Sequence, residues 1–419
     1  MDYDPSGGTH AEIVDGPRSG AAIAHEDVAD SPAARLLGEI LRMAAERRAS
    51  DIHVEPEAHG WRVRLRVDGV LHAIPRPAPT LLDAVATRIK VLSRIDIAER
   101  RIPQDGRLRI RTRADAVDEF RVSTLPTLYG EKIVLRRLDT LPDDLSLRAL
   151  GFDADQARVV VRTLDAPHGL VLVTGPTGSG KTISLYAFMH TLDRDAANIC
   201  TVEDPAELEL SGISQVPIRE KAGLTFAVAL RALLRQDPDV IMIGEIRDRD
   251  TADVAVKAAQ TGHLVLSTLH TNDAPSTLAR LVDIGIEPHH LAAAIRLVTA
   301  QRLVRRLCDT CKTPYRADRD IMRAAGYADA IIECSTSLYR ASGCDACHRI
   351  GYRGRIGIHQ VMPVGAALRQ RIAHGAGAPD IAAHAAAEGL GSLRDAALVK
   401  VLTGETSLDA ALRATEFDL

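Results

Sequence analysis

The sequence predicts an α/β protein: a smaller α+β domain, then a domain built on a mostly parallel sheet, then a metal-binding and helical C-terminal region. In residues 33–123, a helical apolar period gives way to strict strand alternation. In residues 170–268, short apolar runs alternate with helix-forming segments, which is typical of a parallel sheet covered by helices. After about residue 285 we expect a largely helical chain that a cysteine-bearing segment interrupts.

The expected boundaries follow from shifts in composition. The first residues are rich in Gly, Asp, Ala and Ser without apolar periodicity, and the segment around Pro142 carries paired acids. We therefore divide the chain into a flexible tail (1–31), the α+β domain (32–140), a linker (141–153), the parallel-sheet core (154–300), a cysteine-bearing segment (301–360) and a helical C-terminal region (361–419).

Within the α+β domain, the apolar residues of 33–48 recur at helical spacing. Residues 61–67 then alternate strictly and end at Asp68-Gly69, a dipeptide typical of a two-residue hairpin turn. Two further stretches, 107–111 and 120–123, complete the expected strands.

Composition disfavours several functions. The chain has 52 basic and 56 acidic residues and a formal net charge of −4. This balance, with only 3% aromatic residues, argues against direct contact with nucleic acid. The apolar runs are far shorter than the ~20 residues of a membrane helix, and the N-terminus lacks the basic and apolar regions of an export signal. We therefore expect a cytoplasmic protein whose membrane association is at most peripheral.

A complete phosphate-binding loop pattern lies between the expected strand 170–174 and a helix-forming stretch. Its glycines allow backbone N–H groups to converge on phosphates, and the helix N-terminus adds a favourable field. Lys181 would place a positive charge on the β- and γ-phosphates, and the Thr182 hydroxyl would ligate Mg²⁺. The pattern predicts that ATP with Mg²⁺ is bound by Gly175, Pro176, Thr177, Gly178, Ser179, Gly180, Lys181 and Thr182.

Three further polar residues follow expected core strands. Glu245 comes after the apolar run 240–243, where it is placed to orient or deprotonate the attacking water. Glu203 lies at another strand end, where a carboxylate can hold Mg²⁺ through water or position the nucleophile; an acidic turn is the alternative. His270 is expected to sense the γ-phosphate or the catalytic glutamate.

Four of the six cysteines form two C-x-x-C pairs. Two such pairs can complete the tetrahedral thiolate shell of a structural Zn²⁺, and reduced, metal-free thiols are the alternative. Cys200 and Cys334 stand apart from the pairs and are expected to be packing residues. The expected zinc ligands are Cys308, Cys311, Cys344 and Cys347.

The order of these motifs resembles that of the traffic ATPases that drive type II secretion and type IV pilus assembly. Besides the phosphate-binding loop, the shared segments are Thr-Val-Glu-Asp-Pro-Ala-Glu at 201–207, Gly-Glu-Ile-Arg-Asp at 244–248 and the histidine-bearing segment 261–272. The resemblance covers residues 33–415 and includes Ala-Ser-Asp-Ile-His-Val-Glu-Pro at 49–56.

The resemblance implies a RecA-like ATPase fold and a homohexamer in which the first domain closes over the nucleotide. It implies that arginines of the first domain reach the phosphates, and Arg121 and Arg136 match those positions. It also implies the tetracysteine zinc site of the assembly branch, with an inner-membrane platform and cytoplasmic docking proteins as partners. The identity of the machine that this ATPase would drive rests on the resemblance alone.

Three departures from the family pattern accompany this resemblance. Ile183 replaces a frequent threonine, Gln360 replaces a frequent glutamate, and the N-terminal docking domain of longer members is expected to be absent or reduced to residues 1–30. Other interpretations stay open: a DNA-uptake or conjugation motor, a pilus-retraction motor, and a non-catalytic scaffold that senses nucleotide.

Overall fold

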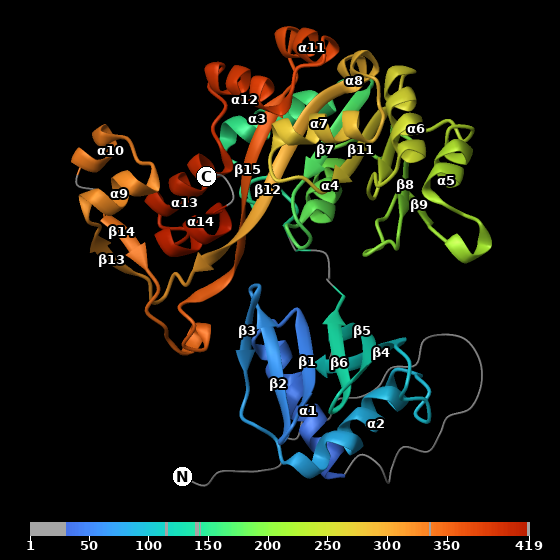
Figure 1. Ribbon diagram of the computed structural model, residues 1–419, viewed down its shortest axis with the longest axis vertical. Coiled ribbons are helices and arrows are strands. Elements are labelled where there is room, and N and C mark those ends of the chain that lie inside the picture. The colour runs from blue at the N-terminus through green and yellow to red at the C-terminus, as the bar shows by residue number, and fades with distance from the viewer. Residues whose placement is uncertain (1–30, 114–115, 139–141, 143, 335–336, 417–419) are drawn as a thin grey trace. The chain divides into compact units, whose positions relative to one another are not determined.

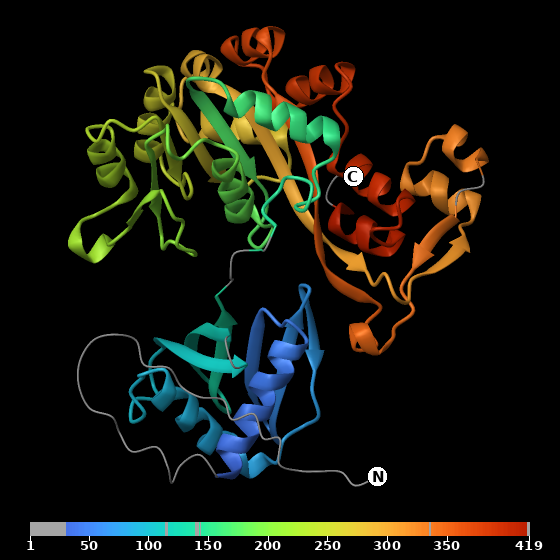
Figure 2. The same ribbon diagram turned by 180° about the vertical axis from the view of Figure 1, so that it is seen from behind.

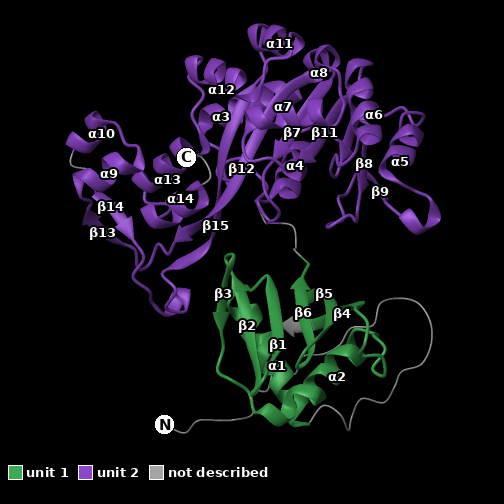
Figure 3. Ribbon diagram, viewed as in Figure 1, with its two compact units in different colours: residues 1–140 green, residues 141–419 purple. Residues whose placement is uncertain are grey.

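The computed structural model divides into two compact units, residues 1–140 (unit 1) and residues 141–419 (unit 2), as Figure 3 shows. The tail expected at 1–31 lies outside the described residues except for Ser31, and so do residues 141 and 143 of the expected linker. Among the residues described, no helix combines the length and the apolar character that crossing a bilayer requires. The structure describes residues 31–113, 116–138, 142, 144–334 and 337–416.

Unit 1 is a six-stranded antiparallel sheet with helices on one face, which Figure 2 shows from the helical side. Its helices are α1 (Pro32–Glu46), the short 3-10 helix η1 (Pro79–Leu81) and α2 (Leu82–Leu92). Its strands are β1 (Asp51–Glu57), β2 (Gly60–Val67), β3 (Val70–Ala73), β4 (Gln104–Arg113), β5 (Ala116–Thr127) and β6 (Gly130–Arg137), in the spatial order β3-β2-β1-β6-β5-β4.

Local sequence explains where α1 begins and where β2 turns into β3. The Ser31 side chain accepts a hydrogen bond of 3.1 Å from the Ala34 N–H and so caps α1, and Pro32 fits the first turn. The hairpin predicted at Asp68-Gly69 is confirmed, because both residues have positive φ and their flanking valines pair directly. The apolar residues of β2 are buried, while the arginines between them face away from the helices.

Unit 2 is built on a seven-stranded sheet in the order β15-β12-β7-β11-β10-β8-β9. All neighbouring pairs are parallel except β12 with the edge strand β15. The parallel sheet predicted from the alternating apolar runs is therefore confirmed. The strands are β7 (Gly169–Thr174), β8 (Ile199–Glu203), β9 (Ser214–Pro217), β10 (Val240–Ile243), β11 (Leu264–Leu269), β12 (Ile295–Leu307) and β15 (Tyr352–Pro363).

Helices cover both faces of this sheet (Figure 1). On one face lie α3 (Ala154–Leu164) and α4 (Lys181–His190). On the other lie α5 (Phe226–Leu233), α6 (Arg249–Gln260), α7 (Ala274–Asp283) and α8 (Pro288–Ala294). Successive residues of β7 are buried in opposite cores, as burial on both faces requires.

The remaining elements of unit 2 include the cysteine-bearing segment between β12 and β15 and the C-terminal helices. The cysteine-bearing segment contains the small hairpin β13 (Thr313–Arg316) and β14 (Ser337–Arg340), and the 3-10 helix η3 (Asp345–Cys347). A further 3-10 turn, η2 (Glu220–Ala222), precedes α5. The other helices are α9 (Arg319–Ala325), α10 (Asp329–Glu333), α11 (Ala366–Ala373), α12 (Ala378–Ala387), α13 (Leu393–Leu402) and α14 (Leu408–Ala414).

The expectation of a largely helical chain after residue 285 is wrong for β12 and β15, the two long strands that widen the sheet. β12 is buried on both faces over most of its length, so its apolar residues do not alternate. Periodicity alone cannot distinguish such a run from a buried helix. Cys200 is buried as expected, but Cys334 is exposed and is therefore not a packing residue.

A buried histidine of β15 makes the stability of unit 2 depend on pH. The His359 ring stacks on Phe152 at a centroid distance of 3.6 Å and lies 3.1 Å from the Leu150 carbonyl oxygen through Nε2. Burial lowers the pKa of His359 from 6.5 to about 4. The folded chain therefore holds this ring neutral where the unfolded chain protonates it.

We expect acidification from pH 6.5 to pH 4 to destabilise unit 2 through His359. In this window the unfolded state binds more protons than the folded state. The free energy of unfolding therefore decreases as the pH is lowered, by up to about 3 kcal/mol from this group. Thermal unfolding at several pH values should show a steeper loss in the wild type than in His359→Phe, which keeps an aromatic ring against Phe152 but cannot titrate. Parallel profiles for the two proteins would contradict the assignment.

Candidate active site

The parallel strands of unit 2 bring the expected catalytic residues to one edge of the sheet. β7 runs into the phosphate-binding loop, β8 ends at Glu203, Glu245 follows β10, and His270 follows β11. Because neighbouring parallel strands share a direction, the residues that follow them meet at the same edge. Side chains that are distant in sequence therefore lie close together in space.

The phosphate-binding loop leads directly into α4. Gly180 is the N-cap of α4 and has a φ of 85°, while Gly175 has a φ of 148°. A Cβ added to Gly175 would lie 2.4 Å from the Gln301 carbonyl oxygen, so only glycine allows this close approach. A tight loop that ends at a helix N-terminus is an anion-binding site. Its exposed tip consists of Pro176, Thr177 and Gly178.

Lys181 is held inside this loop. Its Nζ donates hydrogen bonds of 2.8 Å to the Gly175 carbonyl and 3.1 Å to the Pro176 carbonyl, and lies 3.5 Å from the His270 Nδ1. Burial lowers the pKa of Lys181 to about 8, although the nearby Glu245 carboxylate opposes the shift. Thr182 is the next residue of α4 and is half-buried.

The Glu245 carboxylate has a basic partner at each oxygen. Its Oε2 lies 3.4 Å from the His270 Nε2, and its Oε1 forms an ion pair with Arg247. His270 thus lies between Lys181 and Glu245, with one ring nitrogen facing each. The three groups form one contiguous cluster of a cation, an imidazole and a carboxylate.

Glu203 is buried and accepts hydrogen bonds from three side chains. The donors are the hydroxyl of Tyr186 at 2.5 Å, the hydroxyl of Thr201 at 2.7 Å and the amide of Gln215 at 2.9 Å. Burial raises the pKa of Tyr186, and the adjacent Glu203 raises it further. These bonds fix the orientation of the carboxylate at the end of β8.

Sequence reasoning missed several residues that complete this edge. Arg247 had a usable signal, since it follows Glu245 by two residues. Tyr186, Gln215 and Gln301 had none, because each bonds to a partner on another element that is distant in sequence.

The predicted arginines, Arg121 and Arg136, lie on unit 1, on the face of the sheet opposite the helices. They pair directly across β5 and β6, and Arg107 pairs with Arg121 from β4. All three line one hollow of unit 1. The Nε of Arg136 donates a hydrogen bond of 2.8 Å to Oδ1 of Asp51, a buried residue of β1. Despite burial, this bond and that from Ser50 keep the pKa of Asp51 below its usual value.

The four paired cysteines converge as the spacing predicted, with all four sulfur atoms within 4.8 Å of one another. The Sγ–Sγ distances are 3.9 Å for Cys308 and Cys344, 3.8 Å for Cys311 and Cys347, and 3.8 Å for Cys344 and Cys347. A tetrahedral shell with Zn–S bonds of about 2.3 Å has sulfur–sulfur edges of about 3.8 Å. Although burial opposes it, N–H bonds from Cys344 and Gly351 lower the pKa of Cys347 to about 7.

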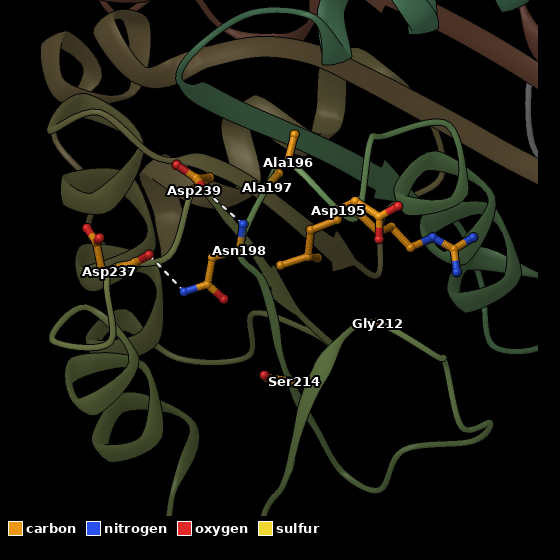
Figure 4. Close-up of a pocket in the computed structure, with 10 residues that line it drawn as sticks. Asp195, Ala196, Ala197, Asn198, Gly212, Ser214, Asp237 and Asp239 are labelled. Carbon is orange, nitrogen blue, oxygen red and sulfur yellow. Dashed lines mark hydrogen bonds between the residues drawn. The ribbon is translucent and has the colours of Figure 1, made fainter.

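Unit 2 also has a hollow. It lies at the edge of the seven-stranded sheet opposite the phosphate-binding loop, beside the amino ends of β8 and β10 (Figure 4). Its polar groups bond to one another: the Asn198 N–H donates to Asp239, and the Asn198 side chain donates to the carbonyls of Gln236 and Asp237. This hollow contains none of the predicted catalytic residues.

Comparison with known proteins identifies the family. The model of the type II/IV secretion system protein family matches residues 26–413. The chain belongs to this family. Among its relatives, the type IV pilus assembly ATPase PilB of Myxococcus xanthus is 47% identical over 390 residues, which are 93% of this chain and 69% of that protein. The type II secretion system protein E of Pseudomonas aeruginosa is 48% identical over 386 residues, 92% of this chain and 76% of that protein.

Two solved structures share the fold of this chain. The ATPase DotB of Legionella pneumophila superposes with a TM-score of 0.64 at 20% identity, covering 91% of this chain and 96% of DotB. The pilus retraction motor PilT, solved with bound ADP, superposes with a TM-score of 0.58 at 25% identity, covering 90% of this chain and 96% of PilT.

Proposed function

We propose that the chain is a Mg²⁺-dependent ATPase that powers a type II secretion or type IV pilus assembly machine. One observation carries the proposal: Lys181, His270 and Glu245 form a continuous chain of contacts at the carboxyl edge of one sheet. A phosphate-binding cation, a sensor and a base within reach of one another are what transfer of a phosphoryl group to water needs.

The residues of the loop fit a triphosphate and its magnesium ion. Gly175 permits the tight turn beside Gln301, Lys181 supplies a buried cation, and Thr182 supplies a hydroxyl ligand for Mg²⁺ at the start of α4. Bound Mg²⁺ would supply charge neutralisation at the phosphates. The loop backbone binds the phosphate oxygens, and the Lys181 charge lowers the barrier by electrostatic stabilisation of the charge that develops on the transferred phosphoryl group.

Around this loop, Glu245 takes the proton of the attacking water, and His270 orients the carboxylate through Oε2. Arg247 holds the other carboxylate oxygen. Glu203 would hold Mg²⁺ through a water molecule, and its three donors keep its carboxylate in one orientation.

The arginines of unit 1 would complete the site in a homohexamer. Arg136 and Arg121 are the proposed cations for the charge that develops on the transferred phosphoryl group. The Arg136 side chain is 67% exposed, so most of its guanidinium is accessible to a phosphate. The anchor at Asp51 engages Nε and would hold the remaining N–H groups in a constant orientation.

The load is proposed from the relatives, which are named as a pilus assembly ATPase and a type II secretion protein. The proposed partners are an inner-membrane platform and its cytoplasmic docking proteins, and the proposed location is the cytoplasmic face of that membrane. The four-cysteine cluster is proposed to hold one structural Zn²⁺, because its sulfur–sulfur distances match the edges of a tetrahedral thiolate shell.

The first test is phosphate release by the purified protein with Mg²⁺-ATP, with the oligomeric state recorded on the same samples. We expect turnover that rises with hexamer formation and falls at least about 100-fold in Glu245→Gln, since general-base catalysis contributes about 10²–10⁴. Asp253→Asn, an exposed carboxylate on α6, is the control and should retain full activity. A formed ring without turnover would favour a nucleotide-sensing scaffold, and strong stimulation by DNA would favour a DNA motor.

The zinc proposal predicts one Zn²⁺ per chain by elemental analysis. Cys308→Ser should lose the metal and lower the melting temperature by about 5 °C or more, because the site ties β12 to the start of β15. Cys334→Ser is the matched control, since Cys334 is exposed and lies outside the cluster, and it should keep both metal and stability. A stably folded wild-type protein that contains no bound zinc would contradict the proposal.

Arg136 and Asp51 should behave as a coupled pair in hydrolysis. We expect Arg136→Ala to lower kcat about 100-fold or more and Asp51→Asn about 5- to 10-fold, because Asp51 acts through the guanidinium that it anchors. The double variant should match Arg136→Ala alone. Arg76→Ala, which removes an exposed arginine paired with Glu57, is the control. Additive losses of kcat in the double variant would show that the two residues act independently and would contradict this prediction.

A further inference from the structure

A glutamine of β12 contacts the phosphate-binding loop with both its main chain and its side chain. Gln301 is 2% exposed and lies one residue beyond Ala300, which pairs with Thr174, the last residue of β7. Its main-chain carbonyl is the atom that excludes a Cβ at Gly175. The middle of β12 therefore packs directly against the phosphate-binding loop.

The side chain of Gln301 is bonded at both ends. Its Nε2 donates a hydrogen bond of 2.6 Å to the Ser179 carbonyl, and its Oε1 accepts a hydrogen bond of 2.8 Å from the Ser184 hydroxyl. Ser184 is a buried residue in the first turns of α4. One amide thus links β12 to the loop and to the helix that follows it.

The bond to Ser179 fixes more than one carbonyl group. A trans peptide unit is planar, and its C=O and N–H point in opposite directions. Holding the Ser179 carbonyl against β12 therefore directs the N–H of Gly180 away from β12. Backbone N–H groups of this loop are the donors that bind phosphate, so their orientation determines affinity.

We propose that Gln301 is the positioning residue of the phosphate-binding loop, which it holds preorganised for a nucleoside triphosphate by fixing the Ser179–Gly180 peptide. The inference rests on the proposed function in that the loop must bind ATP. Gln301 acts through the loop backbone. Because that backbone holds the phosphates alike in the ground state and the transition state, its loss should weaken binding rather than slow the chemical step.

The chain offers a matched control on the neighbouring strand. Gln360 of β15 is also buried, with an Oε1 that accepts a bond of 2.9 Å from the Ala274 N–H and an Nε2 that donates 3.3 Å to the Gly391 carbonyl. It holds α7 and the segment before α13 rather than the loop. Gln301→Met and Gln360→Met therefore remove equivalent buried hydrogen bonds, one at the loop and one away from it.

The experiment measures Kd for a fluorescent, magnesium-bound ADP analogue, with KM and kcat for ATP and the melting temperature of each variant. We expect Gln301→Met to raise Kd and KM roughly 5- to 20-fold while kcat stays within about twofold, and Gln360→Met to leave Kd within about twofold. Equal loss in both variants, unchanged Kd in Gln301→Met, or a loss confined to kcat would overturn the proposal.

A second variant covers the case in which Gln301→Met fails to fold. Ser184→Ala removes only the bond that orients the Gln301 amide, and it should raise Kd about two- to fivefold. Where both variants fold, the double variant should match Gln301→Met alone; an additive loss, or an unchanged Kd in Ser184→Ala, would contradict the inference. Wild type that binds no nucleotide would overturn the proposed function itself, which distinguishes the two failures.

Discussion

The structure of unit 2 depends on one constraint, the parallel pairing of strands that are buried on both faces. Parallel pairs require crossover helices, and those helices cover the sheet on each side. The same pairing places the ends of β7, β8, β10 and β11 at one edge. The catalytic cluster is therefore a direct consequence of strand direction, and its residues need no proximity in sequence.

That edge also creates a problem, because polar groups between a buried sheet and its helices lose contact with water. The structure meets the problem by pairing them: Glu203 has three donors, Lys181 has two carbonyl acceptors, and Gln301 is bonded at both ends. An unpaired partner at these depths would cost about 1–3 kcal/mol or more. The hydrogen bonds that satisfy these groups are thus also the ones that orient them for chemistry.

The sequence predicted those parts of the molecule whose signals are local. The phosphate-binding loop, the strands before it and after it, and the tetracysteine cluster all follow from patterns of a few residues. β12 and β15 were expected to lie in a helical region because strands buried on both faces do not alternate. Gln301 and Tyr186 could not be found either, because their roles arise from contacts with elements distant in sequence rather than from their neighbours in the chain.

Unit 1 applies a different rule, since in an antiparallel sheet the register alone decides which side chains meet. Direct pairing across five strands sets Arg66, Asp51, Arg136, Arg121 and Arg107 in one row on the face opposite the helices. The four arginines of this row would repel one another, and the buried Asp51 between Arg66 and Arg136 reduces that repulsion. A shift of register by one residue would move Asp51 to the apolar face and separate the row. The pairing of β1 with β2 and β6, and of β5 with β4 and β6, therefore determines where the arginines of this family member lie.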